Sequence, residues 1–391
     1  MTSDLRYDTV IVGAGVAGLY TALKLPREQK ILIICKEDLD SCDSMLAQGG
    51  ICVMVDDEDY DSFFADTMRA GHNENRKESV DIMIRGSRKV IDDLLAWGVR
   101  FEKNPDGSLK YTREGAHSRP RICFHKDVTG REITSVLQSR VKELENVTIM
   151  DYTVMTDLLV SDGQCRGISA KAKNGEELAI RAENTVLATG GIGGLYEHST
   201  NFPSLTGDGL TVAEKHGVEI EHRDYVQFHP TSLYTTKPGR SFLITESARG
   251  EGALLLDSKG ERFTDELQPR DVVTKAILEK MAAEGTKHVW LSFAPIPKET
   301  ILAHFPNIYK TCLEEGYDIT REPIPIVPAQ HYFMGGVRVD SDSKTEMPHL
   351  YAVGETSCNG VHGKNRLASN SLLESLVFAN RAANHIAAGK E

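Results

Sequence analysis

The stretch that decides the fold reads YDTVIVGAGVAGL and covers residues 7–19. Within it, residues 8–12 form the continuous run of β-forming side chains that is typical of a buried parallel strand. A helical pattern follows over 17–25, and a second β-forming run covers 30–35. This βαβ order, at about the expected length, predicts the first unit of a Rossmann-like α/β domain.

The loop between this strand and helix has the spacing GxGxxG, with Gly13, Gly15 and Gly18 at the glycine positions. Gly13 permits the tight turn, Gly15 lets the backbone approach a pyrophosphate, and Gly18 lets helix and strand pack closely. The helix N-terminus then faces the anion. Because the motif lies between a strand and a helix, it predicts a dinucleotide-binding site rather than a Gly-rich turn without a ligand.

The end of the second strand departs from a simple NAD site. It reads Cys35-Lys36-Glu37 and lacks the usual ribose-binding acid at that position. Glu37 either takes that part or lies on the surface, and the residues alone leave both interpretations open. Lys36 is a candidate cofactor contact.

The composition is that of a globular protein with more than one domain. The chain has 391 residues, 40% of them hydrophobic and 26% charged, and its net charge of −12 argues against a nucleic-acid partner. We expect no membrane span, because no apolar run is long enough, and no signal peptide, because a strand begins almost at once. The seven cysteines are scattered and lack CxxC spacing. They indicate free thiols in a reducing cytosol, and we expect no metal site.

The following elements continue the α/β pattern. Helical spacing covers residues 59–70 and 78–97, which we interpret as scaffold, and a loop at 119–129 leads into a further helix at 130–144. Residues 148–181 are β-rich and are interrupted by Asp-Gly and Asn-Gly pairs, which predict an antiparallel meander. Residues 184–191 then return to the parallel sheet.

The pattern changes between residues 223 and 336. Proline, glycine, histidine and charged residues increase there, and the alternation of strands and helices is lost. If both ends of the chain form one site, the middle must be an insertion above it. We therefore predict an α+β capping domain over 223–336, inserted into a Rossmann-like domain made of 1–222 and 337–391.

A series of motifs extends over nearly the whole chain. They are VGAGVAG (12–18), AQGGI (47–51), ATGG (188–191), TGDG (206–209), QFHPT (227–231), TESARGEG (245–252), PRD (269–271), HYFMGG (331–336) and NRLASNS (365–371). In this order they resemble the flavoprotein family that contains L-aspartate oxidase, fumarate reductase and succinate dehydrogenase. The resemblance implies an FAD cofactor, dicarboxylate substrates, and a cap that closes over the flavin.

The resemblance also implies which residues contact FAD. Small residues and glycines at 44–51 allow a backbone loop to press against a flat ring. The implied cofactor contacts are Gly13, Ala14, Gly15, Gly18, Lys36, Ser44, Ala47, Gln48, Gly49, Gly50, Gly191, Asp208, Glu355, Ser371 and Leu372. For Asp208, capping of the following helix is a compatible alternative.

Three features point within this family to the L-aspartate oxidases. Asp43 stands where membrane-complex members carry the histidine that bonds to the flavin, so the resemblance implies non-covalent FAD. The segment TREGAHS (112–118) resembles the aspartate oxidase form of a loop in which other members have a neutral glutamine. No feature suggests an iron–sulfur partner or a membrane anchor. Aspartate oxidases usually continue as a helical C-terminal domain, so this chain, which ends at Glu391, is either a short member or a truncated one.

A dicarboxylate needs cationic anchors in a dry site, and arginine suits a carboxylate because its planar group forms two parallel hydrogen bonds. By resemblance, Arg366 and His331 hold one carboxylate, whereas His229 and Thr245 hold the other. A surface arginine and two ordinary core histidines are the alternatives.

Arg270 matches the residue that shuttles a proton in fumarate reduction. An unperturbed guanidinium titrates far above neutral pH, so this role requires an unusual setting, and a plain salt bridge is the alternative. Glu246 and Arg249 either form its proton relay or make an ion pair that holds the cap.

Glu114 is the candidate that distinguishes aspartate from succinate. The two substrates differ by one α-ammonium, and a carboxylate near it would contribute roughly 1–3 kcal/mol if partly desolvated. The alternative is a loop glutamate that faces water.

These assignments predict oxidation of L-aspartate to iminoaspartate by hydride transfer to FAD, followed by reoxidation with oxygen, giving hydrogen peroxide, or with fumarate, giving succinate. The family implies the first step of NAD biosynthesis, with quinolinate synthase consuming the imine. Two alternatives remain open: a soluble fumarate reductase or succinate-oxidising flavoprotein, and a flavin-binding subunit without turnover.

Overall fold

A computed structural model describes residues 3–237 and 239–389 of the chain. Its centre is a seven-stranded sheet in the order β6-β2-β1-β9-β8-β7, with β16 also paired to β9. The strands are β1 (Ser3–Val12), β2 (Ile31–Ile34), β6 (Val147–Met150), β7 (Val154–Ser161), β8 (Gln164–Lys171), β9 (Glu177–Leu187) and β16 (Leu350–Ala352). Pairing is parallel from β6 through β9 and at β16, and antiparallel along β9-β8-β7.

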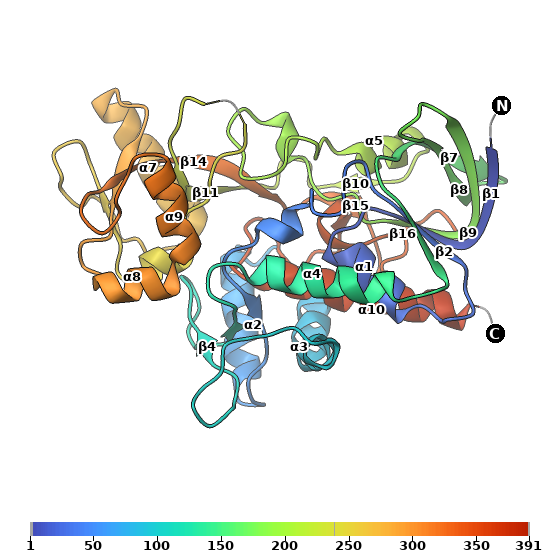
Figure 1. Ribbon diagram of the computed structural model, residues 1–391, viewed down its shortest axis with the longest axis horizontal. Coiled ribbons are helices and arrows are strands. Elements are labelled where there is room, and N and C mark those ends of the chain that lie inside the picture. Colours follow the sequence, from blue (N-terminus) through green and yellow to red (C-terminus); the bar gives the residue numbers. More distant parts are fainter. Residues whose placement is uncertain (1–2, 238, 390–391) are drawn as a thin grey trace.

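Helices cover the two faces of this sheet, and the alternation of side chains in β1 explains why. Ile11 belongs to a core formed with the helices α1, α3, α4 and α10, whereas Val10 and Val12 point to a second core with β7, β8 and α5. A strand with both faces buried reads as a continuous apolar run. The helices are α1 (Val16–Lys24), α2 (Asp59–Ala70), α3 (Lys77–Trp97), α4 (Thr129–Lys142), α5 (Asp208–Lys215) and α10 (Asn370–Ala388). Figure 1 shows α1, α4 and α10 side by side below the sheet and α5 above it.

The predicted hairpin turns are confirmed, but the extent of the meander needs correction. Asp162 and Gly163 both have positive φ (52° and 72°), and Gly175 has φ 83°. However, residues 147–150 do not belong to the meander, because β6 pairs in parallel with β2. In addition, β9 is one strand that serves both the meander and the parallel sheet.

The middle of the chain forms a separate layer, at the left of Figure 1. A four-stranded sheet in the order β11-β14-β13-β12 is packed with helices over a third hydrophobic core, which is drawn entirely from residues 233–326. Its elements are β11 (Val226–Leu233), α6 (Glu246–Gly250), β12 (Leu254–Leu256), α7 (Arg270–Glu284), β13 (Val289–Ser292), α8 (Lys298–His304), α9 (Pro306–Glu314) and β14 (Ile324–Phe333). The α/β fold class is therefore confirmed, whereas the domain boundaries at 222/223 and 336/337 stay a prediction.

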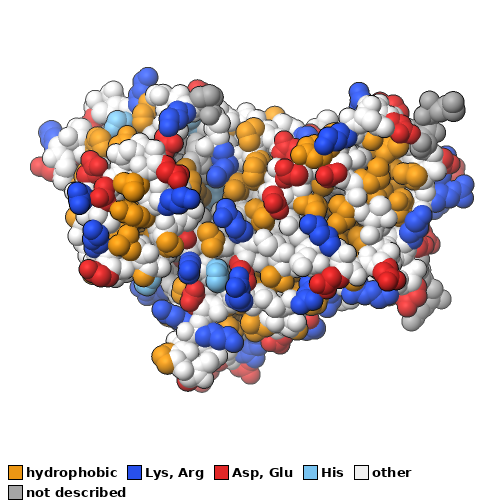
Figure 2. All heavy atoms as spheres, viewed as in Figure 1, with side chains coloured by type: hydrophobic (Ala, Val, Ile, Leu, Met, Phe, Trp, Pro, Cys, Tyr) orange, Lys and Arg blue, Asp and Glu red, His pale blue; other side chains and the backbone are white. Residues whose placement is uncertain are grey.

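Two small sheets and three 3-10 turns bring distant loops together at the site. The sheets are β3 (Ile51–Cys52), β5 (Ile122–Cys123) and β4 (Tyr111–Thr112), and β10 (Ile220–Glu221), β15 (Gly336–Arg338) and β17 (Ser357–Cys358); the turns are η1 (Asp43–Leu46), η2 (Gly193–Leu195) and η3 (Gly354–Thr356). On the face in Figure 2, basic and acidic side chains are interspersed. In the part of the chain that the structure describes, no helix has the length and apolar character to cross a bilayer.

Candidate active site

One cavity collects residues from both ends and from the middle of the chain. Most of the predicted site residues line it: Gly13, Ala14, Gly15, Lys36, Ser44, Ala47, Gln48, Gly49, Gly50, Glu114, Asp208, His229, Thr245, Glu246, Arg270, His331, Glu355, Arg366, Ser371 and Leu372. Three do not line it: Gly18, Gly191 and Arg249 lie behind residues that do.

The glycine-rich turn has the geometry that a pyrophosphate requires. Gly13 has φ 118°, and a Cβ there would lie 2.0 Å from the carbonyl oxygen of Ala188. A Cβ at Gly18 would lie 2.1 Å from the oxygen of Gly13, so this residue serves packing within the turn. A Cβ at Gly15 would meet only Ser44 Oγ, at 3.2 Å, which leaves the backbone open to the cavity. The residues present therefore fit an anion at the N-terminus of α1.

Beyond β2, Lys36 connects the strand to a distant loop. Its Nζ lies 2.6 Å from Asp208 and donates to the carbonyl oxygen of Ser204 at 2.6 Å. Glu37 also lines the cavity and accepts a hydrogen bond from Ser204 Oγ at 3.0 Å. Gly207, and not Asp208, occupies the N-cap position of α5. Asp208 therefore lines the cavity as the partner of Lys36 and is not the helix cap, and its contact with the cofactor stays a prediction.

Buried polar atoms face the part of the cavity bounded by the 43–50 loop and η3. Gln48 donates from Nε2 to the Leu243 carbonyl at 2.7 Å, and its Oε1 has no partner among the described residues. Glu355 accepts from the backbone N–H of Phe333 at 2.9 Å, and burial followed by repulsion from Asp43 raises its pKa to about 8. A buried amide oxygen without a partner is costly, and a polar ring system such as that of FAD would supply one.

Gly191 packs against Glu355, and Asp43 lines the cavity nearby. A Cβ at Gly191 would lie 2.2 Å from Glu355 Oε1, so this glycine leaves room for the carboxyl group without lining the cavity. Asp43 accepts from the N–H of Phe202 at 2.9 Å, and burial raises its pKa to about 7.

The candidate carboxylate anchors all line the cavity: Arg366, His229 and Thr245 are buried, and His331 is partly exposed. Arg366 is 4% exposed, donates to Ser371 Oγ at 3.1 Å and lies over the ring of Tyr332 at 4.7 Å. The rings of His229 and His331 pack edge to face, with centroids 5.2 Å apart. Burial, and then the charge of Arg270, lowers the pKa of both histidines well below the usual value, so both rings are neutral. The alternative of a surface arginine does not fit the burial of Arg366, whereas the roles of the two histidines as substrate anchors stay predictions.

Thr245 also lines the cavity and immediately precedes α6. It occupies the N-cap position, where its side chain accepts a hydrogen bond from the backbone N–H of Ser247. A threonine N-cap stabilises a helix start by about 1 kcal/mol. The cap therefore fixes the position of the Thr245 side chain at the cavity.

Three charged side chains form a chain that leads from the cavity into the middle segment. Arg270 Nε donates to Glu246 Oε2 at 2.5 Å, and Arg249 Nη2 lies 3.5 Å from the same oxygen. Burial opposes ionisation of Glu246, but Arg270 and Arg249 outweigh it and lower its pKa. The arrangement suits both a proton relay and an ion pair that holds the segment, and the roles of the three residues stay predictions.

Glu114 lies inside the site and not in water, since it is 4% exposed. Ser369 donates to its Oε2 at 2.6 Å, and Ser247 donates to its Oε1 at 3.2 Å. A Cβ at Gly49 would lie 2.4 Å from Oε1, so the glycine leaves the room that this carboxyl group needs. Burial, and then repulsion from Glu246, raises the pKa of Glu114.

Several lining residues were not singled out from the sequence. Tyr332 and Ser369 line the cavity and lie within the HYFMGG and NRLASNS motifs, so the motifs indicate that both residues are near the site. Arg240, Thr200 and Leu243 also line it but belong to no motif. Thr200 hydrogen-bonds the ring of His331 at 2.7 Å, a contact that only the fold creates.

Comparison with known proteins defines the class of protein. The FAD binding domain family model matches residues 8–372. A variant of the E. coli quinol fumarate reductase superposes with a TM-score of 0.92 at 32% identity, over 100% of this chain and 72% of that chain. Mycobacterium smegmatis Sdh1 superposes with a TM-score of 0.84 at 32% identity, over 99% of this chain and 69% of that chain. These matches and the cavity define a flavin-dependent oxidoreductase whose cofactor is FAD.

The sequence comparison is more specific. The L-aspartate oxidase of Clostridium perfringens is 48% identical over 377 residues, which are 96% of this chain and 85% of that protein. The L-aspartate oxidase of Clostridium acetobutylicum is 47% identical over 98% of this chain and 88% of its own length. The chain belongs to the L-aspartate oxidase family within the FAD-binding flavoproteins.

Proposed function

We propose that this chain oxidises L-aspartate to iminoaspartate, with non-covalently bound FAD as the immediate electron acceptor. The buried carboxyl group of Glu114 carries the proposal, because its hydrogen-bond partners are the uncharged hydroxyls of Ser369 and Ser247. Glu246, which also lines the cavity, is instead paired with Arg270. A plain dicarboxylate gains nothing from such a group, whereas an α-ammonium does. Membership in the L-aspartate oxidase family supports the same substrate.

In this proposal the anchors hold the two ends of the substrate. Arg366 and His331 hold one carboxylate, while His229 and Thr245 hold the other. Both histidines are neutral, so each offers one N–H donor without a further charge, and Arg366 supplies the cation. Fixing both ends orients the Cα–H bond, and orientation supplies a large part of the rate in such reactions. A bound flavin supplies the two-electron acceptor for that hydrogen.

Arg270 and Glu246 complete the site next to these anchors. The 2.5 Å contact holds the guanidinium of Arg270 at the cavity wall. From there Arg270 neutralises carboxylate charge and, with Glu246 and Arg249, offers a path for a proton.

We further propose that oxygen or fumarate reoxidises the enzyme, giving hydrogen peroxide or succinate. The product imine is unstable in water, so a condensing enzyme such as quinolinate synthase would consume it in the first steps of NAD biosynthesis. The family of the chain supports this place in metabolism.

The test is anaerobic reduction of the purified yellow holoenzyme with L-aspartate, D-aspartate and succinate. We expect L-aspartate to bleach the flavin absorbance and D-aspartate to leave it. Bleaching by succinate with none by L-aspartate would show a succinate-oxidising flavoprotein instead. Bleaching by neither, in protein that retains its flavin, would show a binding subunit without turnover.

A further inference from the structure

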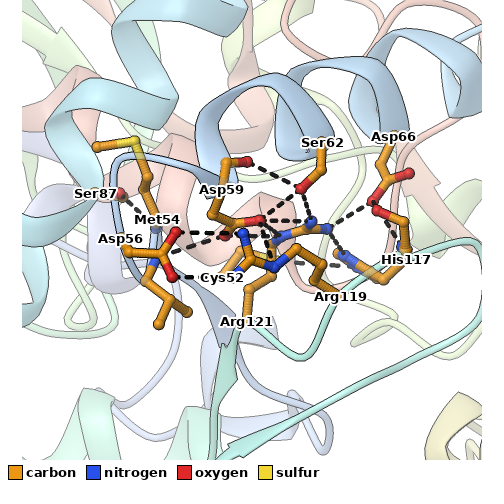
Figure 3. Close-up of polar contacts among 12 residues, drawn as sticks. Cys52, Met54, Asp56, Asp59, Ser62, Asp66, Ser87, His117, Arg119 and Arg121 are labelled. Atoms are coloured by element: carbon orange, nitrogen blue, oxygen red, sulfur yellow. Dashed lines mark hydrogen bonds and ion pairs between the residues drawn. The ribbon is translucent and has the colours of Figure 1, made fainter.

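A buried charged cluster includes His117, three residues after Glu114 in the chain, and none of the roles above uses it (Figure 3). At its centre is Arg121, whose side chain is 0% exposed. Asp59 and Asp66, both on α2, contact it at 2.9 and 2.7 Å. These carboxylates compensate the buried charge of the guanidinium, and Arg69, 2.6 Å from Asp66, balances the second negative charge.

The guanidinium of Arg121 has five N–H groups, and five acceptor contacts account for them. Nε donates to Asp59, and Nη2 donates to Asp59 and to Ser62 Oγ. Nη1 donates to Asp66 and lies 3.0 Å from Nδ1 of His117. Arginine has no acceptor. Nδ1 of His117 must therefore be the accepting nitrogen in this contact.

This contact fixes the tautomer of His117. A neutral imidazole with an accepting Nδ1 carries its hydrogen on Nε2. Nε2 lies 3.0 Å from the carbonyl oxygen of Ala368, to which it donates. The ring is neutral because burial, and then the charge of Arg121, lowers its pKa to about 4.

The carbonyl that His117 holds is one peptide away from the partner of Glu114. Ser369 follows Ala368 in the left-handed conformation (φ 61°), which is uncommon for a residue with a side chain. Its hydroxyl donates to Glu114 at 2.6 Å and accepts from the N–H of Gly50 at 3.2 Å. The direction of this hydroxyl thus depends on a peptide that His117 clamps.

We propose that His117 is a positioning residue for substrate recognition: its Nε2–H, fixed by Arg121, holds the Ala368 peptide so that Ser369 orients the carboxyl group of Glu114. This inference rests on the proposed function in one respect, namely that Glu114 binds the substrate ammonium. The residue touches neither substrate nor cofactor in this scheme and acts through Ser369.

Two nearly isosteric variants test it. His117→Gln keeps one donor and one acceptor at the end of the side chain, whereas His117→Met fills the same space without them. We expect His117→Met to raise the Kd and KM for L-aspartate about tenfold, the equivalent of about one hydrogen bond, with a smaller change in kcat. The KM for fumarate should change far less, and His117→Gln should restore most of the affinity for aspartate.

The matched control is Arg119→Gln. Arg119 lies two residues from Arg121 and pairs with Asp56 at 2.9 Å; it also lies 3.9 Å from Asp59, but it makes no contact with His117. Its substitution should leave the KM values for L-aspartate and for fumarate unchanged. Holoenzyme melting curves show whether each variant is folded. If His117→Met fails to fold, the tautomer of His117 in the wild-type holoenzyme still tests the inference. ¹⁵N spectra of histidine-labelled holoenzyme should show a neutral ring with its hydrogen on Nε2. The signal of His117 is assigned as the one that is lost in His117→Gln.

The tautomer of His117 and the substrate preference of His117→Met decide the inference. An Nδ1–H or cationic ring overturns the inference, as does a His117→Met variant that keeps the wild-type preference for aspartate over fumarate while Glu114→Gln loses it. In both cases the proposed function stands. If wild-type enzyme is not bleached by L-aspartate, the proposed function fails, and this inference fails with it.

Discussion

Substitution of Glu114 by glutamine separates charge from shape at the point where aspartate and succinate differ. The amide oxygen of glutamine can still accept from Ser369, and its NH₂ can donate to Ser247, so both contacts of the carboxyl group have a counterpart. The side chain is 4% exposed, and a neutral amide costs less to bury there than a carboxylate. We therefore expect the folded structure to tolerate the change and only the charge to be lost.

The expected magnitude follows from that burial. A charge-assisted hydrogen bond is worth about 1.5–3 kcal/mol, so the loss in kcat/KM for L-aspartate should be about tenfold to about 150-fold. Fumarate carries no ammonium, and its reduction should fall by no more than about threefold, the size of a small packing change.

The assay compares peroxide release from L-aspartate with fumarate reduction by the same enzyme preparation. Glu145→Gln is the matched control, since Glu145 is exposed and does not line the cavity. Equal losses on both substrates would refute the assignment of Glu114 to the ammonium.

Three further predictions address other parts of the site. Arg270→Leu should keep the yellow colour of bound flavin and lose turnover by about a hundredfold or more, measured with saturating aspartate; retained turnover would remove Arg270 from the chemistry. The pKa of His117 falls from 6.5 to about 4 on folding, so the unfolded chain binds more protons than the folded chain between these pH values. The free energy of unfolding should therefore fall by up to about 3 kcal/mol as the pH drops through this window. Urea titrations of His117→Gln should show a smaller change of the free energy of unfolding with pH. Gly13→Ala should abolish FAD binding and cost more than about 2 kcal/mol, because the added Cβ meets the Ala188 oxygen at 2.0 Å. Gly260→Ala, also at positive φ (78°) but with open space around it, should cost only about 1 kcal/mol and keep the flavin, as calorimetry and flavin absorbance would show.

Local features of the site could be predicted from the sequence because local sterics determine them. Gly13 and Gly18 stand where the strand-to-helix turn needs a positive φ and close packing, and both requirements are visible in one short stretch. The helix at 59–70 has the bounds that its apolar spacing predicts. In such places the physical cause and its signal lie within a few residues of each other.

Contacts between distant segments could not be predicted in this way. Asp59 and Asp66 lie on a helix whose periodicity marks it as scaffold, and their burial depends on Arg121, which comes from a loop that follows β4. A carboxylate on a helix is usually exposed unless a partner reaches it, and the sequence pattern of the helix does not contain that partner. The pairing of Lys36 with Asp208 is hidden for the same reason, because the sequence marks each residue as a candidate cofactor contact but does not show that the two meet.

Gln227 shows how the fold sets the relation between the two arginines of the site. Its Oε1 accepts from Arg270 Nη1 at 3.0 Å, while its Nε2 donates at 2.8 Å both to the carbonyl oxygen of Arg366 and to Asn365 Oδ1. The backbone carbonyl accepts only, so the amide has one possible orientation, and Oε1 is necessarily the group that faces Arg270. A single buried side chain therefore fixes the position of Arg270, from the middle segment, against the loop of Arg366, from the C-terminal part. The distance between a carboxylate anchor and the group proposed to act on the proton therefore depends on this amide.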